Sequence, residues 1–304
     1  MPKMLHASGL TFPFASAAVP SSAESTTAPY RPRRIAPAVP DRHDPPALTA
    51  ISDTRAILER AGLGPIRAID RASYQAAAPP HLWPEALGAP RTRAIVVVAS
   101  GGRGHWAAFL RWLTVDPASR LARERHPMDR FAGESLDAAA AALRTAGEEA
   151  LVVQPTMNAA IVLDFVRLGV LAGLGSPSRV GVLISPHVGT WLALRGALFT
   201  SADWPIDATS PESPCIRCPA PCVAACPAAL PAEASFPWQT CFDTRKREPA
   251  CETACGARAA CPVGAEHRYD PLEVLYHYHR EKGRSALCAR FGVADEIGGV
   301  GQMG

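Results

Sequence analysis

The sequence predicts an α+β domain followed by a small cysteine-rich module. Between residues 49 and 205, apolar side chains recur with the spacings of helices and of strands. The proline-rich connector DWPIDATSPESP follows, and eight of the nine cysteines lie between Cys215 and Cys261. A chain of 304 residues, 48% of them hydrophobic, can bury a core without help from a metal or a disulfide. The clustered cysteines therefore need another explanation.

Charge and hydropathy narrow the class of protein. The formal net charge is only +3, which leaves binding to a nucleic-acid backbone unsupported. No apolar run reaches the roughly 18 residues that a membrane span requires, so we expect no membrane partner. Residues 1–48 are rich in Ala, Pro, Ser and Thr and predict a disordered tail. Lys3 precedes LTFPFASAA, but this run is too short and too interrupted for a secretory signal, and we expect a cytoplasmic protein.

The first elements of the domain follow in chain order. SDTRAILERAGLG predicts a short helix from Ser52, with Gly62 and Gly64 as stop signals. TRAIVVVAS (92–100) is β-branched and nearly all apolar, which predicts a strand covered on both faces, and GHWAAFLRWL after it has helical spacing. The turn between them, SGGRGH, lacks the Gly-Lys-Ser/Thr ending of a phosphate-binding loop. We interpret it as a plain tight turn.

The second half of the domain alternates in the same way. GESLDAAAAALRTAG (133–147) predicts a helix and EALVVQP (149–155) a strand. NAAIVLDFVRLGVLAGLG (158–175) predicts a third helix with Asn158 as its cap. RVGVLISP and TWLALRGALFT predict two more strands, joined through residues 186–189.

The C-terminal segment, residues 269–304, predicts a helix in DPLEVLYHYHREKG. Asp270 is the expected N-cap, and Glu273 stands at the capping-box position. His277 and His279 are two residues apart, so on a straight helix they point to different faces and cannot share a metal. We interpret both histidines as packing or surface groups, and Cys288 as a buried apolar residue.

The cysteines of the module, residues 206–268, fall into two sets of four, each closing on Cys-Pro. Disulfides suit small secreted domains, and a zinc site usually has two separated Cys-x2-Cys pairs, whereas only Cys215 and Cys218 have that spacing. The run CIRCPAPCVAACP is one residue longer than the bacterial ferredoxin pattern Cys-x2-Cys-x2-Cys-x3-Cys-Pro. We favour two 4Fe-4S clusters over zinc and disulfides.

In ferredoxins with this pattern, the last cysteine of each run ligates the other cluster. Crossed ligation assigns these cysteines to the first cluster: Cys215, Cys218, Cys222 and Cys261. It assigns these to the second: Cys226, Cys241, Cys251 and Cys255. The basic run Arg245, Lys246 and Arg247 could dock an acidic redox partner, but a solvated loop is the commoner reason for such residues.

The segment LAGLGSPSRVGVLISPHVGTWLALRGALFT, running into CIRCPAPCVAACPAAL, resembles the core of epoxyqueuosine reductases and reductive dehalogenases. ISPHVGTWLALRGAL also resembles the cobalamin-processing proteins of the same superfamily. The resemblance covers about a third of the chain, roughly residues 151–262. It implies a nitroreductase-like α+β sandwich domain that holds a cobalamin beside a ferredoxin-like double-cluster module. The cofactor-binding positions that we carry over are Gly173, Gly175, Ser185, His187 and Gly189.

The chain departs from these reductases at the catalytic acid. Their aspartate precedes the Gly-Leu-Gly turn by about fourteen residues, which corresponds to Ala159 in this chain. The nearest carboxylate, Asp164, is one turn from Arg167 and resembles a surface ion pair. We therefore assign no catalytic residue and leave enzymatic activity open.

The sequence thus predicts an iron–sulfur redox protein that receives electrons from a donor protein. Its two clusters would pass these electrons to a cofactor or small-molecule substrate in the α+β domain, with a corrinoid as one candidate. A ferredoxin-like electron carrier or a cobalamin-handling protein is the alternative. A zinc-stapled interaction module is a third.

Overall fold

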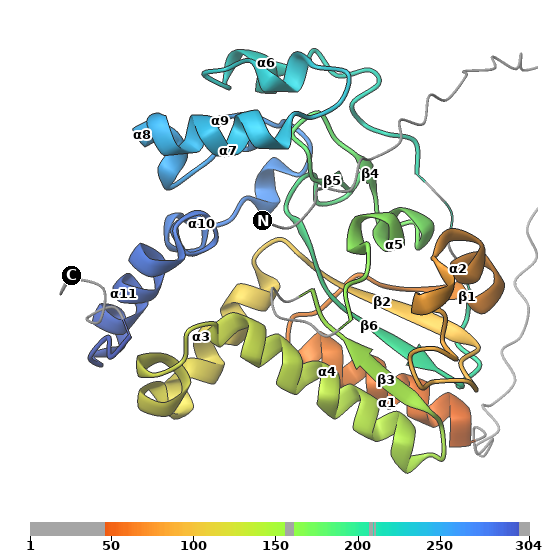
Figure 1. The fold of residues 1–304 in the computed structure, drawn as a ribbon. Helices are drawn as coiled ribbons and strands as arrows, with labels where there is room; N and C mark the ends of the chain where they lie inside the picture. Colours follow the sequence, from red (N-terminus) through yellow and green to blue (C-terminus); the bar gives the residue numbers. More distant parts are fainter. Residues whose placement is uncertain (1–45, 156–160, 207–208, 210, 298–304) are drawn as a thin grey trace, which may run out of the picture. The chain divides into compact units, whose positions relative to one another are not determined.

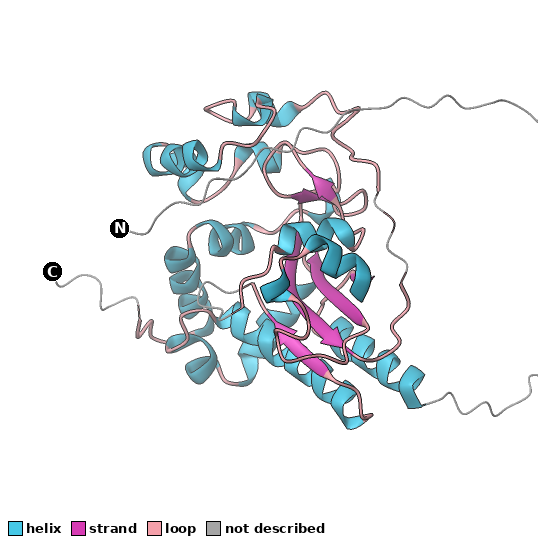
Figure 2. Cartoon of the chain, turned by 45° about the vertical axis from the view of Figure 1, so that its right-hand side comes forward, coloured by secondary structure: helices cyan, strands magenta, loops and turns pink. Residues whose placement is uncertain are grey.

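The computed structural model describes residues 46–155, 161–206, 209 and 211–297. At its centre is an antiparallel sheet of four strands. Their order across the sheet is β1 (Ile66–Asp70), β2 (Ala94–Gly101), β6 (Leu192–Thr200) and β3 (Ala150–Val153). Figure 2 shows these strands in magenta with helices on both sides. The predicted α+β class is confirmed.

Strand β2 divides the hydrophobic core in two, because successive side chains of a strand point to opposite faces. Val96 and Val98 belong to one core and Ile95 and Val97 to the other, and all four are fully buried. Helices α1 (Pro46–Arg60), α3 (Gly104–Val115) and α4 (Pro127–Thr145) contribute to the first core. Helices α2 (Arg71–Ala77) and α5 (Phe165–Leu171) contribute to the second. Burial on both faces explains the unbroken apolar run of β2.

The predicted strands and helices of the first half are confirmed with shifted bounds. Helix α1 begins at Pro46 rather than at Ser52. Ala50 and Ile51 are buried in the core, and this packing extends the helix past the local signal at Ser52. Strand β1 and helix α2 were not predicted.

The predicted helix 158–175 is wrong in length. Its proposed cap, Asn158, lies outside the described residues, and α5 begins only at Phe165. The carboxylate of Asp164 is the N-cap of this helix and accepts a hydrogen bond from the backbone N–H of Arg167 at 2.9 Å. This capping bond replaces the ion pair that we expected between the two side chains.

The predicted strand 179–186 is also much shorter than expected. Only β5 (Leu183–Ile184) is strand, and it pairs with β4 (Ser176–Pro177) in a small separate hairpin. Gly181 turns this hairpin with φ +77°, and Phe236 packs so closely against it that a Cβ would lie 2.5 Å from the ring. Glycine is the residue that tolerates both conditions.

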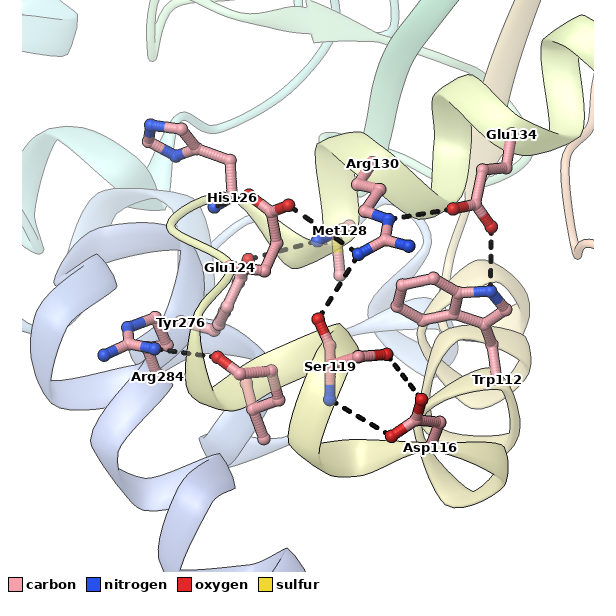
Figure 3. Close-up of polar contacts among 11 residues, drawn as sticks. Trp112, Asp116, Ser119, Glu124, His126, Met128, Arg130, Glu134, Tyr276 and Arg284 are labelled. Atoms are coloured by element: carbon pink, nitrogen blue, oxygen red, sulfur yellow. Dashed lines mark hydrogen bonds and ion pairs between the residues drawn. The ribbon is translucent and has the colours of Figure 1, made fainter. Parts of the chain in front are cut away.

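The C-terminal helix is two helices, α10 (Pro271–Tyr278) and α11 (Arg280–Phe291). Figure 3 shows how they are held against the loop between α3 and α4. The phenol of Tyr276 accepts a bond from the backbone N–H of Met128, and Arg284 donates to the carbonyl of Leu121 at 2.9 Å. The helical segment from residue 271 onward is thus part of the domain's packing.

The same figure shows the network that orders this loop. Arg130 donates to Glu134 at 2.8 Å and to the carbonyl of Ser119, while Trp112 donates to the other carboxylate oxygen of Glu134. Asp116 accepts from the backbone and the hydroxyl of Ser119. The π-helical turn η2 (Ala118–Ala122) is therefore tied to both flanking helices.

The cysteine-rich module consists of short helices, α6 (Pro221–Ala224), α7 (Trp238–Arg247), α8 (Pro249–Glu252) and α9 (Gly256–Ala259). Single 3-10 turns complete the chain: η1 (Pro80–Leu82), η3 (Leu230–Ala232) and η4 (Ala265–His267). Figure 1 shows α6 to α9 gathered beside the β4–β5 hairpin. Within the described part of the chain, no helix has the length and apolar character needed to cross a membrane.

Candidate functional site

The structure gathers the eight module cysteines into two groups, each around its own cavity. The first group comprises Cys215, Cys218, Cys222 and Cys261, which line one pocket. We call it quartet one. Cys222 and Cys261 are buried, and burial raises the pKa of both thiols; the neighbouring cysteines of the quartet raise it further.

Quartet two comprises Cys226, Cys241, Cys251 and Cys255. These cysteines line a second cavity, whose other lining residues are mostly apolar. Burial raises the pKa of the Cys241 and Cys251 thiols, and the nearby Cys255 and Cys226 raise it further. The two groups are the same sets of four that crossed ligation predicts from the sequence.

The chemistry of these donor sets fits thiolate ligands of a cluster. All nine cysteines are free of disulfide bonds. Thiols with raised pKa values stay protonated unless a cation draws off their protons, because a coordinating thiol is deprotonated outright. Among the described residues, no group of three or more His, Cys, Asp or Glu is spaced to hold a single metal ion. Each quartet thus offers four free thiols.

Two sulfur atoms already accept backbone hydrogen bonds. The N–H of Ala220 donates to Cys218 Sγ, and the N–H of Arg258 donates to Cys255 Sγ, both at 3.4 Å. Ala220 adopts a left-handed conformation with φ +56°, which is unfavourable for alanine. Strain of this kind collects at functional sites, and here it aims an amide at a sulfur. Such bonds are one means by which proteins tune iron–sulfur clusters.

The module meets the α+β domain along two glycine contacts. A Cβ on Gly189 would lie 1.9 Å from the carbonyl oxygen of Val263, and a Cβ on Gly264 would lie 2.3 Å from the backbone of Val188. Both glycines have positive φ, +61° and +65°. The hairpin residue Val180 lines both cavities. The module backbone that follows Cys261, at Val263 and Gly264, is thus in direct contact with the α+β domain at Val188 and Gly189.

Arg258 reinforces this junction from the module. Its guanidinium donates twice to the carbonyl of Thr190, at 2.7 and 3.1 Å. It also lies over the rings of Trp191 and Tyr269, at 4.5 and 5.0 Å from their centroids. A cation held against aromatic faces is stabilised electrostatically. The backbone N–H of the same residue, Arg258, donates to Cys255 of quartet two.

The structure accounts for the glycines carried over as cofactor positions through packing. Gly173 has φ +68°, and a Cβ there would meet the backbone of Thr209 at 2.4 Å. A Cβ on Gly175 would lie 2.6 Å from the carbonyl oxygen of Ile184. Gly189 is required by Val263, as above. These three positions need glycine whether or not a cofactor binds.

The remaining two carried-over positions differ from each other. Ser185 is buried, and its hydroxyl accepts a bond from the backbone N–H of His187 at 3.2 Å. His187 itself is exposed on the loop that carries Gly189. Of the five positions, only His187 presents a free side chain to a ligand.

A cluster of polar side chains under α10 was missed by the sequence interpretation. The members of this polar cluster are Ser100, His105, Arg195, Glu273 and His277. Arg195 is the extra residue of a β-bulge, because Val98 pairs with Gly196 while the next residue of β2 pairs with Leu194. Bulges re-aim a side chain, and here Arg195 donates to Ser100 Oγ at 2.9 Å.

Three polar atoms of this cluster are buried without a hydrogen-bond partner among the described residues: His105 Nε2, His277 Nε2 and Glu273 Oε2. Burial raises the pKa of Glu273 to about 8, against an opposing effect of Arg195. Burial lowers the pKa of His105 to about 3 and that of His277 well below its usual value. At neutral pH these side chains are therefore uncharged beside a charged arginine.

The capping-box prediction misplaced Glu273. Asp270 caps α10 as expected, accepting from the backbone N–H of Glu273 at 2.8 Å. The side chain of Glu273, however, is only 2% exposed and turns into the protein. His277 is a packing group as predicted, between Tyr269 and Tyr276. The one sequence signal for the cluster is Arg195, a lone charge inside the apolar run TWLALRGALFT.

No protein-family model matches this chain, and no curated protein matches it. Among solved structures, it is similar to a B12-trafficking protein of C. elegans, at 14% identity and a TM-score of 0.50, over 82% of this chain and 98% of the other. An epoxyqueuosine reductase bound to a tRNA stem loop shares 13% identity over 74% of this chain and 68% of its own, with a TM-score of 0.49. A catabolic reductive dehalogenase shares 16% identity over 77% of this chain and 35% of its own, with a TM-score of 0.44.

These are the three kinds of protein that the sequence resemblance named. At such low identities the likeness speaks to the fold alone. The fold likeness is drawn from the B12-trafficking protein, because the match covers nearly all of that protein.

Proposed function

We propose that this chain is an iron–sulfur redox protein in which quartet one and quartet two each hold a 4Fe-4S cluster. One observation carries the proposal: the fold brings Cys261 back to the first cysteine run and Cys226 forward to the second. Interleaved membership of this kind is what crossed ligation by two ferredoxin-type runs requires.

The residues around the cavities suit such clusters. When bound, each cluster would supply storage for one electron. The apolar lining of the second cavity would keep water from the thiolates of quartet two. The amide of Ala220 would offset negative charge in quartet one, and the amide of Arg258 would do so in quartet two. On this proposal, residues 206–268 form the ferredoxin-like module, and residues 49–205 form the nitroreductase-like domain that it serves.

The electron acceptor would bind in the α+β domain. A corrinoid is the candidate that the fold likeness to a B12-trafficking protein supports. The exposed His187 lies on the loop that contacts the module, close in sequence to Thr190, which lines the cavity of quartet one. This loop would place a bound ligand on the side of the domain where the electrons arrive.

The alternative is a cobalamin-handling protein or electron carrier without catalysis. It is favoured by Ala159, where the reductases have their catalytic acid; this position lies outside the described residues. Reduction of added corrinoid without turnover of any epoxide substrate would distinguish the alternative from an enzyme.

The first test is an elemental analysis of the protein expressed in a reducing host and purified without oxygen. Roughly eight iron atoms and matching sulfide per chain are expected, together with a broad visible band that dithionite bleaches. Added cobalamin should then shift its own spectrum on reduction. Zinc without sulfide would contradict the proposal.

Replacing Cys226 with serine should remove one cluster and leave the other. Quartet two loses a ligand, whereas quartet one keeps all four, so iron and sulfide should fall by about half. The matched control is Cys288→Ser, because Cys288 lies in α11, outside both quartets. Loss of both clusters, or of neither, together with an unchanged Cys288→Ser protein would show that the ligand sets are wrong.

A further inference from the structure

The surface of α7 carries an exposed aromatic pair beside quartet two. Trp238 and Phe242 are each 49% exposed, and their ring centroids are 6.2 Å apart. They stand one turn apart on the helix, so they share a face, and Lys246 continues that face by one more turn. Large aromatic side chains, exposed and adjacent, are typical of the centre of a protein interface.

An open groove runs beside this face. It is lined on the α7 side by Phe242, Lys246 and Arg247, and on the other side by His279 and Glu281. The surface is therefore hollowed beside its aromatic pair, and the hollow is lined mostly by charged and polar side chains. This shape suits a protruding partner better than a flat contact.

The rim of the aromatic pair is basic. Lys246 is 76% exposed and has one distant ion pair, with Asp243 at 3.5 Å. Arg247 is exposed and makes no ion pair with any described residue. Three acidic side chains also line the groove, Glu248, Glu252 and Glu281, and of these Glu252 is already held by Lys282 at 2.8 Å and by His279 at 3.2 Å. The positive charge that remains at the end of α7 complements an acidic partner.

Quartet two lies directly under this surface. Cys241 belongs to α7 itself, and Trp238 lines the cavity of quartet two. A partner seated on α7 would thus approach the quartet to within about the diameter of a helix, 10–12 Å. No other described pair of exposed large aromatic side chains exists in the chain.

We infer that the α7 surface formed by Trp238, Phe242, Lys246 and Arg247 docks a small acidic electron-carrier protein. The inference rests on the proposed function, since it makes quartet two the entry point for electrons. With a cluster held by quartet two, the docked pair would transfer one electron: the carrier would be oxidised by one electron and the cluster reduced by one.

The test measures binding of a plant-type [2Fe–2S] ferredoxin of net negative charge to the anaerobically purified full chain. The Lys246→Glu, Arg247→Glu double variant should bind at least tenfold more weakly at low salt, and the salt dependence of binding should flatten. The rate of electron transfer from the reduced ferredoxin should fall by a similar factor. Phe242→Ala should weaken binding without changing its salt dependence, because it removes apolar contact only.

The matched control is Arg60→Glu, Arg111→Glu, which makes the same charge change at exposed positions on α1 and α3. It should bind as the wild type does. Equal weakening by both double variants would show a general charge effect and overturn the inference. An unchanged affinity of the α7 variant would overturn it as well.

Iron and sulfide content separates this inference from the proposed function. If the chain holds clusters that dithionite reduces and the α7 variant still binds ferredoxin normally, only the docking surface is overturned. A wild-type chain without clusters would overturn the proposed function, and the docking inference with it.

Discussion

Replacing Gly189 with alanine should destabilise the protein by about 2–5 kcal/mol, through backbone strain at positive φ and overpacking against Val263. Gly189 has φ +61°, and the new Cβ would lie 1.9 Å from the Val263 carbonyl oxygen. The two backbone segments cannot easily move apart, because Gly264 packs closely against the backbone of Val188 in the same contact. Thermal unfolding of the metal-free protein is the measurement.

Gly292→Ala is the matched control. Gly292 has φ +65°, nearly the same conformation, but a Cβ there would have no neighbouring atom within 4 Å, so only the backbone cost of roughly 1–2 kcal/mol applies. The difference between the two variants therefore measures the contact between module and domain. Equal destabilisation would mean that Gly189 and Val263 do not touch in solution. A loss confined to cofactor binding would instead support the role implied by the family resemblance.

Replacing Glu273 with glutamine should make the protein more stable at alkaline pH. Burial raises the pKa of Glu273 to about 8 in the folded protein, from a usual value of 4.5. A group with a raised pKa contributes its full stability below the unfolded pKa and loses that contribution as the pH rises through the folded value. The wild type should therefore lose roughly 4 kcal/mol between pH 5 and pH 9 through this carboxyl, at about 1.4 kcal/mol per pKa unit.

The variant avoids this loss because an amide does not ionise. The free energy of unfolding, measured by denaturant titration at pH 5, 7 and 9, should show the two proteins diverging as the pH rises. The depressed pKa values of His105 and His277 act below pH 6.5 and affect both proteins, so they cancel in the comparison. Glu233→Gln, at an exposed position, is the control and should follow the wild type. Parallel pH profiles for wild type and Glu273→Gln would contradict the burial of this carboxyl.

The sequence predicted those helices and strands in which apolar side chains recur regularly. Strand β2 and helix α3 were predictable because apolar side chains recur along them with the period of their structure. The helix predicted over residues 158–175 was too long, because the apolar spacing begins before Asp164, the residue that caps the start of α5. Strand β1 was missed because its five residues mix charged and apolar side chains.

The grouping of the cysteines was also predictable, since the Cys-Pro ending of each run implies exchange of ligands between runs. What the two quartets hold stays a prediction until iron and sulfide are measured. The contact of Gly189 with Val263 was not predictable, because a glycine required by a neighbouring backbone has the same sequence appearance as one required by a cofactor.

Spacing along the chain was sufficient to predict the α+β class and the main strands, which the structure confirms, and to propose the two cysteine sets. The folded chain was needed to show that Arg195 sits on a bulge, that Glu273 turns inward, and that their side chains meet under α10. Desolvation explains the difference. Whether a polar side chain is buried, and which charge it then keeps, depends on neighbours that the fold brings from distant parts of the chain.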